Sequence, residues 1–206
     1  MSNALRIHGF PLSGHSHRVE LFANLAGIDY EFIKVDLAGG EHKKQPFLSL
    51  NPAGKVPVIQ DEDVVVADSN AILVYLARKY APDWIPTDMP SEAQVQQYLS
   101  FAAGELANGP AAARLITVFG APLDADRAKA VAERAFEYLE AQLKGRVWLV
   151  GDRPSIADVA VYSYTAHAPE GNVSLDTYPN IRGLLTRIEG LNGFVPMPTT
   201  AVGLVA

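Results

Sequence analysis

The most informative segment of the chain reads Asn51-Pro52-Ala53-Gly54-Lys55-Val56-Pro57-Val58-Ile59. Pro57 lies inside a run that otherwise has the pattern of a β-strand, and a proline there removes one donor from the sheet ladder. The segment is therefore either an edge strand with an ordinary proline or a strand entered through a cis Val56–Pro57 bond. In the second case the N–H and C=O of Val56 can point outward and pair with the backbone of a ligand, as an added strand would. The sequence alone leaves both possibilities open.

Short strands and helices alternate around this segment. Strands are predicted at 5–9 and 30–35, and an antiparallel hairpin at 56–60 and 64–67. Apolar residues that recur every three or four positions predict helices at 16–26 and 71–80. This order of elements is typical of an α/β domain with a mixed sheet, which we place at residues 1–80.

Residues 81–90 contain three prolines, which interrupt a helix and favour extended backbone. We interpret this stretch as a linker. Beyond it the pattern is helical throughout, which predicts an all-α domain over residues 91–206. The expected helix starts are Ser91 (with a capping box), Asp124, Ser155 and Pro179, and the expected breaks or ends are Gly109-Pro110, Gly120 and Gly145.

The composition is that of a globular protein, with 49% hydrophobic and 19% charged residues among 206. The net charge of −6 makes nucleic acid an improbable partner, because its binding needs a clustered positive face. No run of 18 apolar residues and no apolar leader is present, so we expect a cytoplasmic protein without membrane association. The absence of cysteine excludes disulfides, thiolate metal ligands and a protein thiol in any mechanism.

Two further segments place polar groups at the start of a predicted helix. The turn over residues 9–18 carries Ser13 and Ser16, and the free backbone N–H groups of a helix start can stabilise an anion such as a thiolate. Asp68 and Ser69 directly precede the helix at 71, where the hydroxyl suits a carboxylate and Asp68 suits an ammonium group. Ordinary N-capping is the simpler interpretation of each serine and of Asp68 when it is taken singly.

The remaining polar residues have structural interpretations. Asp158, three residues after Ser155, is expected to complete a capping box. His167 is expected to be a hydrogen-bonded core or interface histidine, and His15 and His17 are expected to lie at a solvated helix start. No carboxylate stands at a recognised spacing to these histidines, so we expect no metal site.

Taken together, these segments resemble one known family. Residues 1–80 resemble the N-terminal, thioredoxin-like domain of glutathione S-transferases. The turn at 9–13, followed by Arg18-Val19, is similar to the serine-type catalytic turn, and segments 40–49, 51–57 and 68–69 are close to phi-type members. Segment 151–158 resembles the buried capping box of the family's helical domain. The resemblance implies the glutathione S-transferase fold, in which an all-α domain follows the α/β domain.

The resemblance also implies roles for individual residues. Ser13 would donate a hydrogen bond to the sulfur of glutathione. The expected glutathione-binding residues are His42, Lys43 and Lys55 at the glycyl carboxylate, Val56 (before Pro57) at the cysteinyl backbone, and Asp68 with Ser69 at the γ-glutamyl end. Lys55 and Asp68 depart from the phi-type pattern, which usually has glutamine and glutamate at these places. Phe10 and Leu12 would line an apolar substrate pocket, with Glu105, Asn108, Ala112 and Tyr164 as candidate neighbours from the helical domain.

The implied activity is that of a glutathione transferase, in which the thiol of the cosubstrate attacks an electrophilic apolar substrate, with no metal and with a homodimer as the assembly. A free thiol has a pKa of about 8.5, and lowering it by two units requires about 2.7 kcal/mol of differential stabilisation. Two alternatives stay open: a non-catalytic ligand-binding or assembly module, and a glutathione-dependent peroxidase or isomerase. A disulfide reductase is disfavoured because it would need a protein cysteine.

Overall fold

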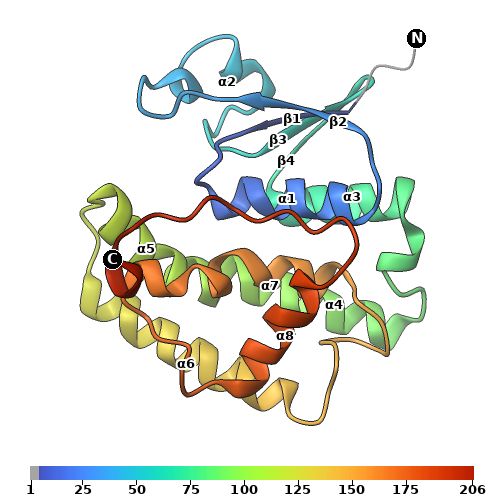
Figure 1. Ribbon diagram of the computed structural model, residues 1–206. Helices are drawn as coiled ribbons and strands as arrows, with labels where there is room; N and C mark the ends of the chain where they lie inside the picture. The colour runs from blue at the N-terminus through green and yellow to red at the C-terminus, as the bar shows by residue number, and fades with distance from the viewer. Residues whose placement is uncertain (1–4) are drawn as a thin grey trace. The chain divides into compact units, whose positions relative to one another are not determined.

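The computed structural model describes residues 5–206 (Figure 1). The chain forms two compact units. The first contains the residues up to Pro82 together with Asn192–Pro198, and the second contains Asp83–Leu191 together with Thr199–Ala206.

A four-stranded mixed sheet with the order β2-β1-β3-β4 forms the centre of the first unit. β1 (Leu5–Gly9) runs parallel to β2 (Tyr30–Lys34) and antiparallel to β3 (Val58–Asp61), and β3 pairs antiparallel with β4 (Val64–Ala67). The α/β domain with a mixed sheet that the sequence predicts is therefore confirmed.

The helices of the first unit cover the sheet on both sides. α1 (Gly14–Leu25) and α3 (Ser69–Tyr80) pack against each other and against the sheet (Figure 1). A smaller cluster around Phe47 and Val58 packs under α2 (Phe47–Leu50), which follows the 3-10 turn η1 (Glu41–Lys43). Neighbouring residues of a strand point to opposite faces, so Val58 and Ile59 serve different sides of the sheet, and both are fully buried.

Three predicted boundaries of the first unit differ from the structure by two residues. α1 and α3 begin at Gly14 and Ser69, because Ser13 and Asp68 are their N-caps. β3 begins at Val58 instead of at residue 56, since its pairing with β1 starts with Val58 opposite His8. The Gln45–Pro46 and Val56–Pro57 peptide bonds are both cis.

The second unit is helical, as predicted. None of the described helices is long and apolar enough to cross a membrane. Its elements are α4 (Met89–Phe101), the π-helix η3 (Ala102–Leu106), α5 (Pro110–Phe119), α6 (Ala125–Leu143), α7 (Ile156–Ala166), η4 (Ala168–Gly171), α8 (Pro179–Glu189) and η5 (Gly203–Val205), and the 3-10 turn η2 (Pro82–Trp84) precedes them.

The predicted N-cap of the first of these helices is wrong by three residues. Asp88, and not Ser91, is the N-cap of α4, and its carboxylate accepts the N–H of Ser91 at 3.0 Å. Pro90 lies in the first turn, where a helix tolerates proline because the missing N–H has no intrahelical partner there. The predicted break at Gly109, the end at Gly120 and the starts at Asp124, Ser155 and Pro179 are confirmed.

Residues 192–198, which the sequence assigns to the helical domain, lie in the first unit. His17 on α1 contacts the carbonyl oxygen of Val195 through Nε2 at 2.9 Å. Gly193 has a φ of +86°, and a Cβ there would lie 2.6 Å from the carbonyl oxygen of Asn24. The close approach to α1 therefore requires glycine at this position.

Candidate functional site

Ser13 occupies the turn between β1 and α1. Its N–H donates to the carbonyl of Phe10 at 2.9 Å, and its Oγ accepts the N–H of Ser16 at 3.3 Å. Within residues 5–206 the hydroxyl hydrogen of Ser13 has no acceptor. Phe10 and Leu12 lie half-buried in the same turn. Ser13 therefore acts as an N-cap through its oxygen while its proton remains available at the positive end of the helix dipole.

The loop before β3 presents an open backbone position at Val56. The Asn51 side chain shapes this loop by donating to the Lys55 carbonyl at 2.8 Å and accepting the N–H of Ala53 at 3.0 Å. Neither the N–H nor the C=O of Val56 has a hydrogen-bond partner among the described residues. An extended peptide could pair with this position through its own backbone.

His42 and Lys43 on η1 lie against the same loop. Lys43 Nζ donates to the carbonyl of Gly54 at 3.1 Å. Gly54 has a φ of +56°, and a Cβ there would lie 2.7 Å from the His42 carbonyl oxygen, so only glycine allows this approach. The Nδ1 atom of His42 is buried without a partner among residues 5–206, and Lys55 is exposed. Two ammonium groups and an imidazole near one loop suit a carboxylate.

Asp68 and Ser69 form the start of α3. Asp68 has a φ of +75°, and its Oδ1 accepts the N–H groups of Asn70 and Ala71 at 2.9 and 3.0 Å. The N–H of Ser69 has no partner in the described part of the chain. A free N–H and a hydroxyl at a helix start suit an anion, while the exposed Asp68 suits a cation.

A buried arginine links the starts of α1 and α3. Arg18 is fully buried, and its Nη1 donates to Ser69 Oγ at 2.8 Å and to Asn70 Oδ1 at 2.9 Å. The His15 ring joins the same network, with Nδ1 at 3.2 Å from Ser69 Oγ. The contact between His15 and Ser69 brings the turn of Ser13 next to the start of α3. Sequence reasoning missed the roles of Arg18 and Asn70, because the partners lie more than 50 residues apart along the chain.

The prediction of a solvated helix start is wrong for His17, while His15 is half-buried. His17 is 2% exposed, because residues 192–198 cover it. Burial lowers the pKa of His15 to about 3, and the positive charges of Arg18 and Lys55 act in the same direction against the opposing effect of Asp68. Lys55 and Asp68 are therefore both close enough to the His15 ring to act on it electrostatically.

Asp158 and His167 in the second unit have structural roles, as the sequence predicts. Asp158 accepts the N–H groups of Leu149 and Ser155 at 2.9 Å each and completes the capping box of α7. Burial raises the pKa of this carboxyl to about 6 against the effect of these hydrogen bonds. Of the candidate pocket residues in this unit, Glu105 and Asn108 are exposed, while Ala112 and Tyr164 are buried.

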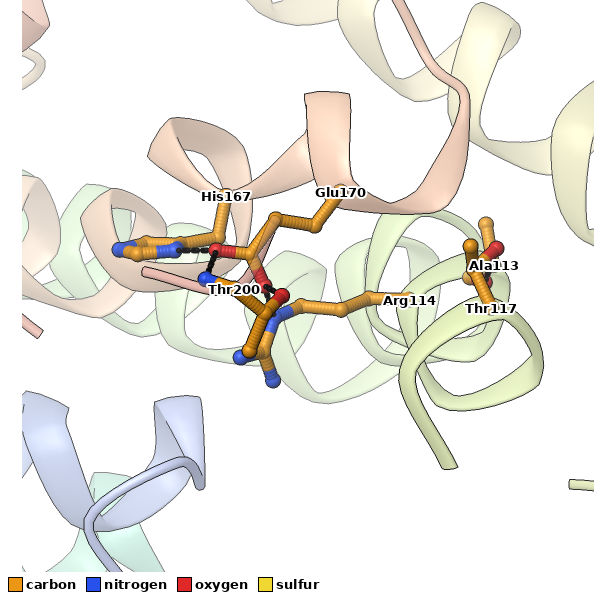
Figure 2. Close-up of polar contacts among 6 residues, drawn as sticks. All are labelled: Ala113, Arg114, Thr117, His167, Glu170 and Thr200. Carbon is orange, nitrogen blue, oxygen red and sulfur yellow. Dashed lines mark hydrogen bonds and ion pairs between the residues drawn. The ribbon is translucent and has the colours of Figure 1, made fainter. Parts of the chain in front are cut away.

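His167 belongs to a buried ion network that Figure 2 shows. Glu170 Oε1 accepts from His167 Nδ1 at 2.7 Å and from the Thr200 N–H at 3.2 Å, and Oε2 accepts from Arg114 Nε and Thr200 Oγ1 at 2.7 Å each. Burial alone would raise the pKa of Glu170, but the hydrogen bonds from His167 and Thr200 and the charge of Arg114 lower it. Burial outweighs the effect of Glu170 and lowers the pKa of His167. The network thus holds a carboxylate against a neutral imidazole and a guanidinium.

No group of three His, Asp or Glu side chains within residues 5–206 could hold a metal ion.

Comparison with known proteins gives the same family for both units. The model of the glutathione S-transferase N-terminal domain matches residues 4–78, and that of the glutathione S-transferase C-terminal domain matches residues 119–192. Glutathione S-transferase F10 of Arabidopsis thaliana is 34% identical over 167 residues, which are 76% of this chain and 78% of that protein.

Two further relatives extend this result. Glutathione S-transferase theta-2 of Homo sapiens is 34% identical over 159 residues, which are 72% of this chain, and the chain spans 65% of that relative's length. The crystal structure of a glutathione S-transferase from Pseudomonas fluorescens superposes with a TM-score of 0.90 at 32% identity, covering 95% of this chain and 99% of that one.

Proposed function

The chain belongs to the glutathione S-transferase family, and from this premise we propose that it is a glutathione transferase. In this proposal the Ser13 hydroxyl stabilises the thiolate of glutathione, which then attacks an electrophilic apolar substrate. The sulfur belongs to the cosubstrate, which is consistent with a chain that contains no cysteine.

The observation that carries the proposal is that the hydroxyl proton of Ser13, at the start of α1, has no acceptor within residues 5–206. A hydrogen bond to a charged group contributes about 1.5–3 kcal/mol, and a helix N-terminus about 0.3–1 kcal/mol. Their sum is close to the roughly 2.7 kcal/mol that lowers a thiol pKa by two units. Ser13 would thus act as a hydrogen-bond donor and not as a nucleophile.

The remaining residues would hold the tripeptide along its length. His42, Lys43 and Lys55 would face the glycyl carboxylate, and the buried unpartnered Nδ1 of His42 supports this assignment. Val56 would pair with the cysteinyl backbone through its open N–H and C=O. The γ-glutamyl group would bind at the start of α3, with its carboxylate on Ser69 and its ammonium group on Asp68.

The finer classification is also a proposal. We assign the chain to the serine-type, phi-like members because of the turn around Ser13 and the similarity of segments 40–49, 51–57 and 68–69 to that type, in which Lys55 and Asp68 are the two departures. The homodimeric assembly and the cytoplasmic location expected from the sequence stay predictions, and so does the electrophilic substrate.

The test compares Ser13→Ala with Ser49→Ala, which removes an exposed hydroxyl of α2 that donates to Gln45 Oε1. Conjugation of glutathione to an aryl halide is measured, and the thiolate absorbance of bound glutathione is followed against pH. We expect Ser13→Ala to lose about 10-fold to 100-fold in rate and to raise the thiol pKa, since one charge-assisted hydrogen bond is lost. Ser49→Ala is expected to match the unsubstituted protein.

Equal activity of Ser13→Ala and the unsubstituted protein would refute the role of Ser13. Glutathione binding without turnover of any acceptor would favour a non-catalytic module, and reduction of a peroxide without conjugation would favour a peroxidase. Product analysis separates these outcomes from one another.

A further inference from the structure

The first turn of α1 carries a histidine for which the proposed function gives no role. His17 is buried, and its Nε2 lies 2.9 Å from the carbonyl oxygen of Val195. A carbonyl oxygen can only accept, so Nε2 carries a hydrogen and donates it. Buried polar groups are nearly always paired in this way, so the contact alone identifies no function. A function follows from a second hydrogen bond of the same residue, which its backbone makes.

The backbone of His17 is bonded to Ser13. Its N–H donates to the Ser13 carbonyl at 2.9 Å, as expected at the start of a helix, where the carbonyl of the N-cap residue accepts. The side-chain contact of Ser13 is longer, because its Oγ lies 3.3 Å from the nitrogen of Ser16, and the usual range is about 2.7–3.2 Å. The placement of the Ser13 hydroxyl therefore depends also on the backbone of the turn, and His17 holds one end of that backbone.

Val195 belongs to residues 192–198, which we call the strap because they lie along α1 (Figure 1). The strap contacts α1 near both ends of the helix. Val195 contacts His17 in the first turn, and Gly193 lies against Asn24 in the last turn, where a Cβ would come within 2.6 Å of the Asn24 carbonyl oxygen. The order of the contacts is reversed along the two segments, so the strap runs antiparallel to α1.

The chain is also anchored beyond the strap. Met197 within the strap is buried. Thr200 donates its N–H to Glu170 Oε1 at 3.2 Å and its hydroxyl to Oε2 at 2.7 Å, in the network of Figure 2. A Cβ at Gly203 would lie 2.5 Å from the carbonyl oxygen of Pro169, so this part of the chain is closely packed as well. The strap is therefore no loose chain end, and it offers His17 a fixed partner.

We propose that His17 is a positioning residue that, through its contact with the strap, holds the first turn of α1 and the Ser13 hydroxyl in the orientation that faces the sulfur of glutathione, an inference that rests on the proposed function. His17 does not touch the cosubstrate in this proposal, since its Nε2 donates to the strap. A hydrogen bond weakens steeply when its donor turns away from the acceptor. A small rotation of the turn would therefore weaken the stabilisation of the thiolate without removing any group that binds the tripeptide.

The first experiment replaces the side chain that links the turn to the strap. His17→Ala removes the donor, whereas His17→Gln keeps an N–H donor of similar reach. The pKa of the bound glutathione thiol is followed by thiolate absorbance, and conjugation to an aryl halide is measured over a range of pH. We expect His17→Ala to raise the thiol pKa by about one unit, which lowers the rate about 10-fold at pH values below the thiol pKa of the unsubstituted protein. The rates of the two proteins are expected to converge at high pH, where the thiol is ionised in both.

Three comparisons separate positioning from a general effect on the fold. His17→Gln is expected to restore most of the rate and of the thiol pKa, and a variant as impaired as His17→Ala would overturn the role of this hydrogen bond. His8→Ala is the matched control, since it removes a histidine on β1 whose Nε2 contacts Gln60 Oε1 at 2.7 Å, and it should leave the thiol pKa unchanged. At acid pH, where the bound thiol is protonated, the affinity of His17→Ala for glutathione measured by calorimetry should also be unchanged. A loss of affinity there would show a distorted site and would overturn the positioning role.

A double substitution tests whether His17 acts through Ser13. Ser13→Ala has no hydroxyl to orient, so adding His17→Ala is expected to raise the thiol pKa no further. A further increase would show that His17 acts on the sulfur by another route, which would overturn the inference. If Ser13→Ala alone leaves the thiol pKa unchanged, the proposed function fails and the inference fails with it. If Ser13→Ala raises the thiol pKa and His17→Ala does not, the inference alone is overturned.

A substitution in the strap decides the question even if His17→Ala does not fold. Gly193→Ala leaves His17 intact and places a Cβ against the Asn24 carbonyl oxygen, which displaces the strap from α1. Gly27→Ala is the matched control, because Gly27 lies just beyond α1 with a positive φ of +65° but has open space around it. We expect Gly193→Ala to raise the thiol pKa and Gly27→Ala to leave it unchanged. The same thiol pKa in both variants would contradict the support of the turn by the strap.

Discussion

Glu170→Gln is expected to destabilise the helical unit by about 3–5 kcal/mol, the usual cost of removing one partner of a buried ion pair. Glu170 and Arg114 are each 2% exposed, and Glu170 accepts four hydrogen bonds. A glutamine offers one oxygen, so its NH₂ group must face two of the donors that now bond the carboxylate. The substitution also removes the negative charge that faces the Arg114 guanidinium.

Urea unfolding followed by circular dichroism measures the loss in free energy of unfolding. Thermal unfolding gives a second measure: for a chain of about 200 residues, each kcal/mol lowers the melting temperature by about 2–4 °C, so the expected decrease is about 6–20 °C. Thr200→Val keeps the carboxylate and removes one of its donors, and we expect it to destabilise the protein by less than Glu170→Gln does.

Asp83→Asn is the matched control. It breaks the ion pair of Asp83 with Arg153, whose side chains are 86% and 64% exposed at a separation of 3.4 Å. Exposed pairs contribute about 0–1 kcal/mol, so this variant is expected to unfold at nearly the same urea concentration as the unsubstituted protein. A loss of stability in Glu170→Gln no larger than that in Asp83→Asn would show that burial does not strengthen the ion pair of Glu170 with Arg114.

Three further outcomes are expected. Gly54→Ala should raise the KM for glutathione several-fold, because its Cβ would meet the His42 carbonyl oxygen at 2.7 Å. Gly40→Ala is the control, since Gly40 has a similar positive φ but open space around it, and it should leave the KM unchanged. Equal effects of the two substitutions on KM would contradict the role of this contact. The folded-state pKa of His15 is lowered from 6.5 to about 3, so its contribution to stability is complete above pH 6.5 and is lost as the pH falls toward 3, by up to about 1.4 kcal/mol per pH unit. In His15→Phe the free energy of unfolding measured with urea should therefore fall less steeply as the pH is lowered from 6.5 to 4. The same pH dependence in both proteins would show that this ring does not titrate as described. Ser13→Asp should keep the cap of α1 and its stability but lose conjugation, because a carboxylate has no proton to donate and repels a thiolate; retained conjugation would contradict the donor role.

The sequence predicts those features whose physical cause is local. Asp124 and Ser155 start helices because a cap needs only its own side chain and the next three residues. The error at Ser91 has the same origin, since Asp88 is an equally good cap and a proline in the first turn does not exclude a helix.

Features that depend on distant residues could not be predicted in this way. The burial of His17 depends on Val195, which is 178 positions away, and the network of Arg18 depends on Ser69 and Asn70. No periodicity in α1 distinguishes a buried arginine with two acceptors from one exposed to solvent. The family resemblance supplied the positions of Ser13 and Ser69, but it did not indicate that His15 contacts Ser69.

The capping role of Ser13 and its proposed catalytic role are compatible because they use different atoms of one hydroxyl. The oxygen accepts the N–H of Ser16, which orients the side chain at the helix start, and this contact leaves the proton unused. A cap of this kind also places the hydroxyl at the positive end of the helix dipole, which by itself stabilises an anion. The capping contact of Ser13 thus orients the hydroxyl in the way that thiolate stabilisation requires. The two interpretations differ only in whether a sulfur occupies the position in front of that proton.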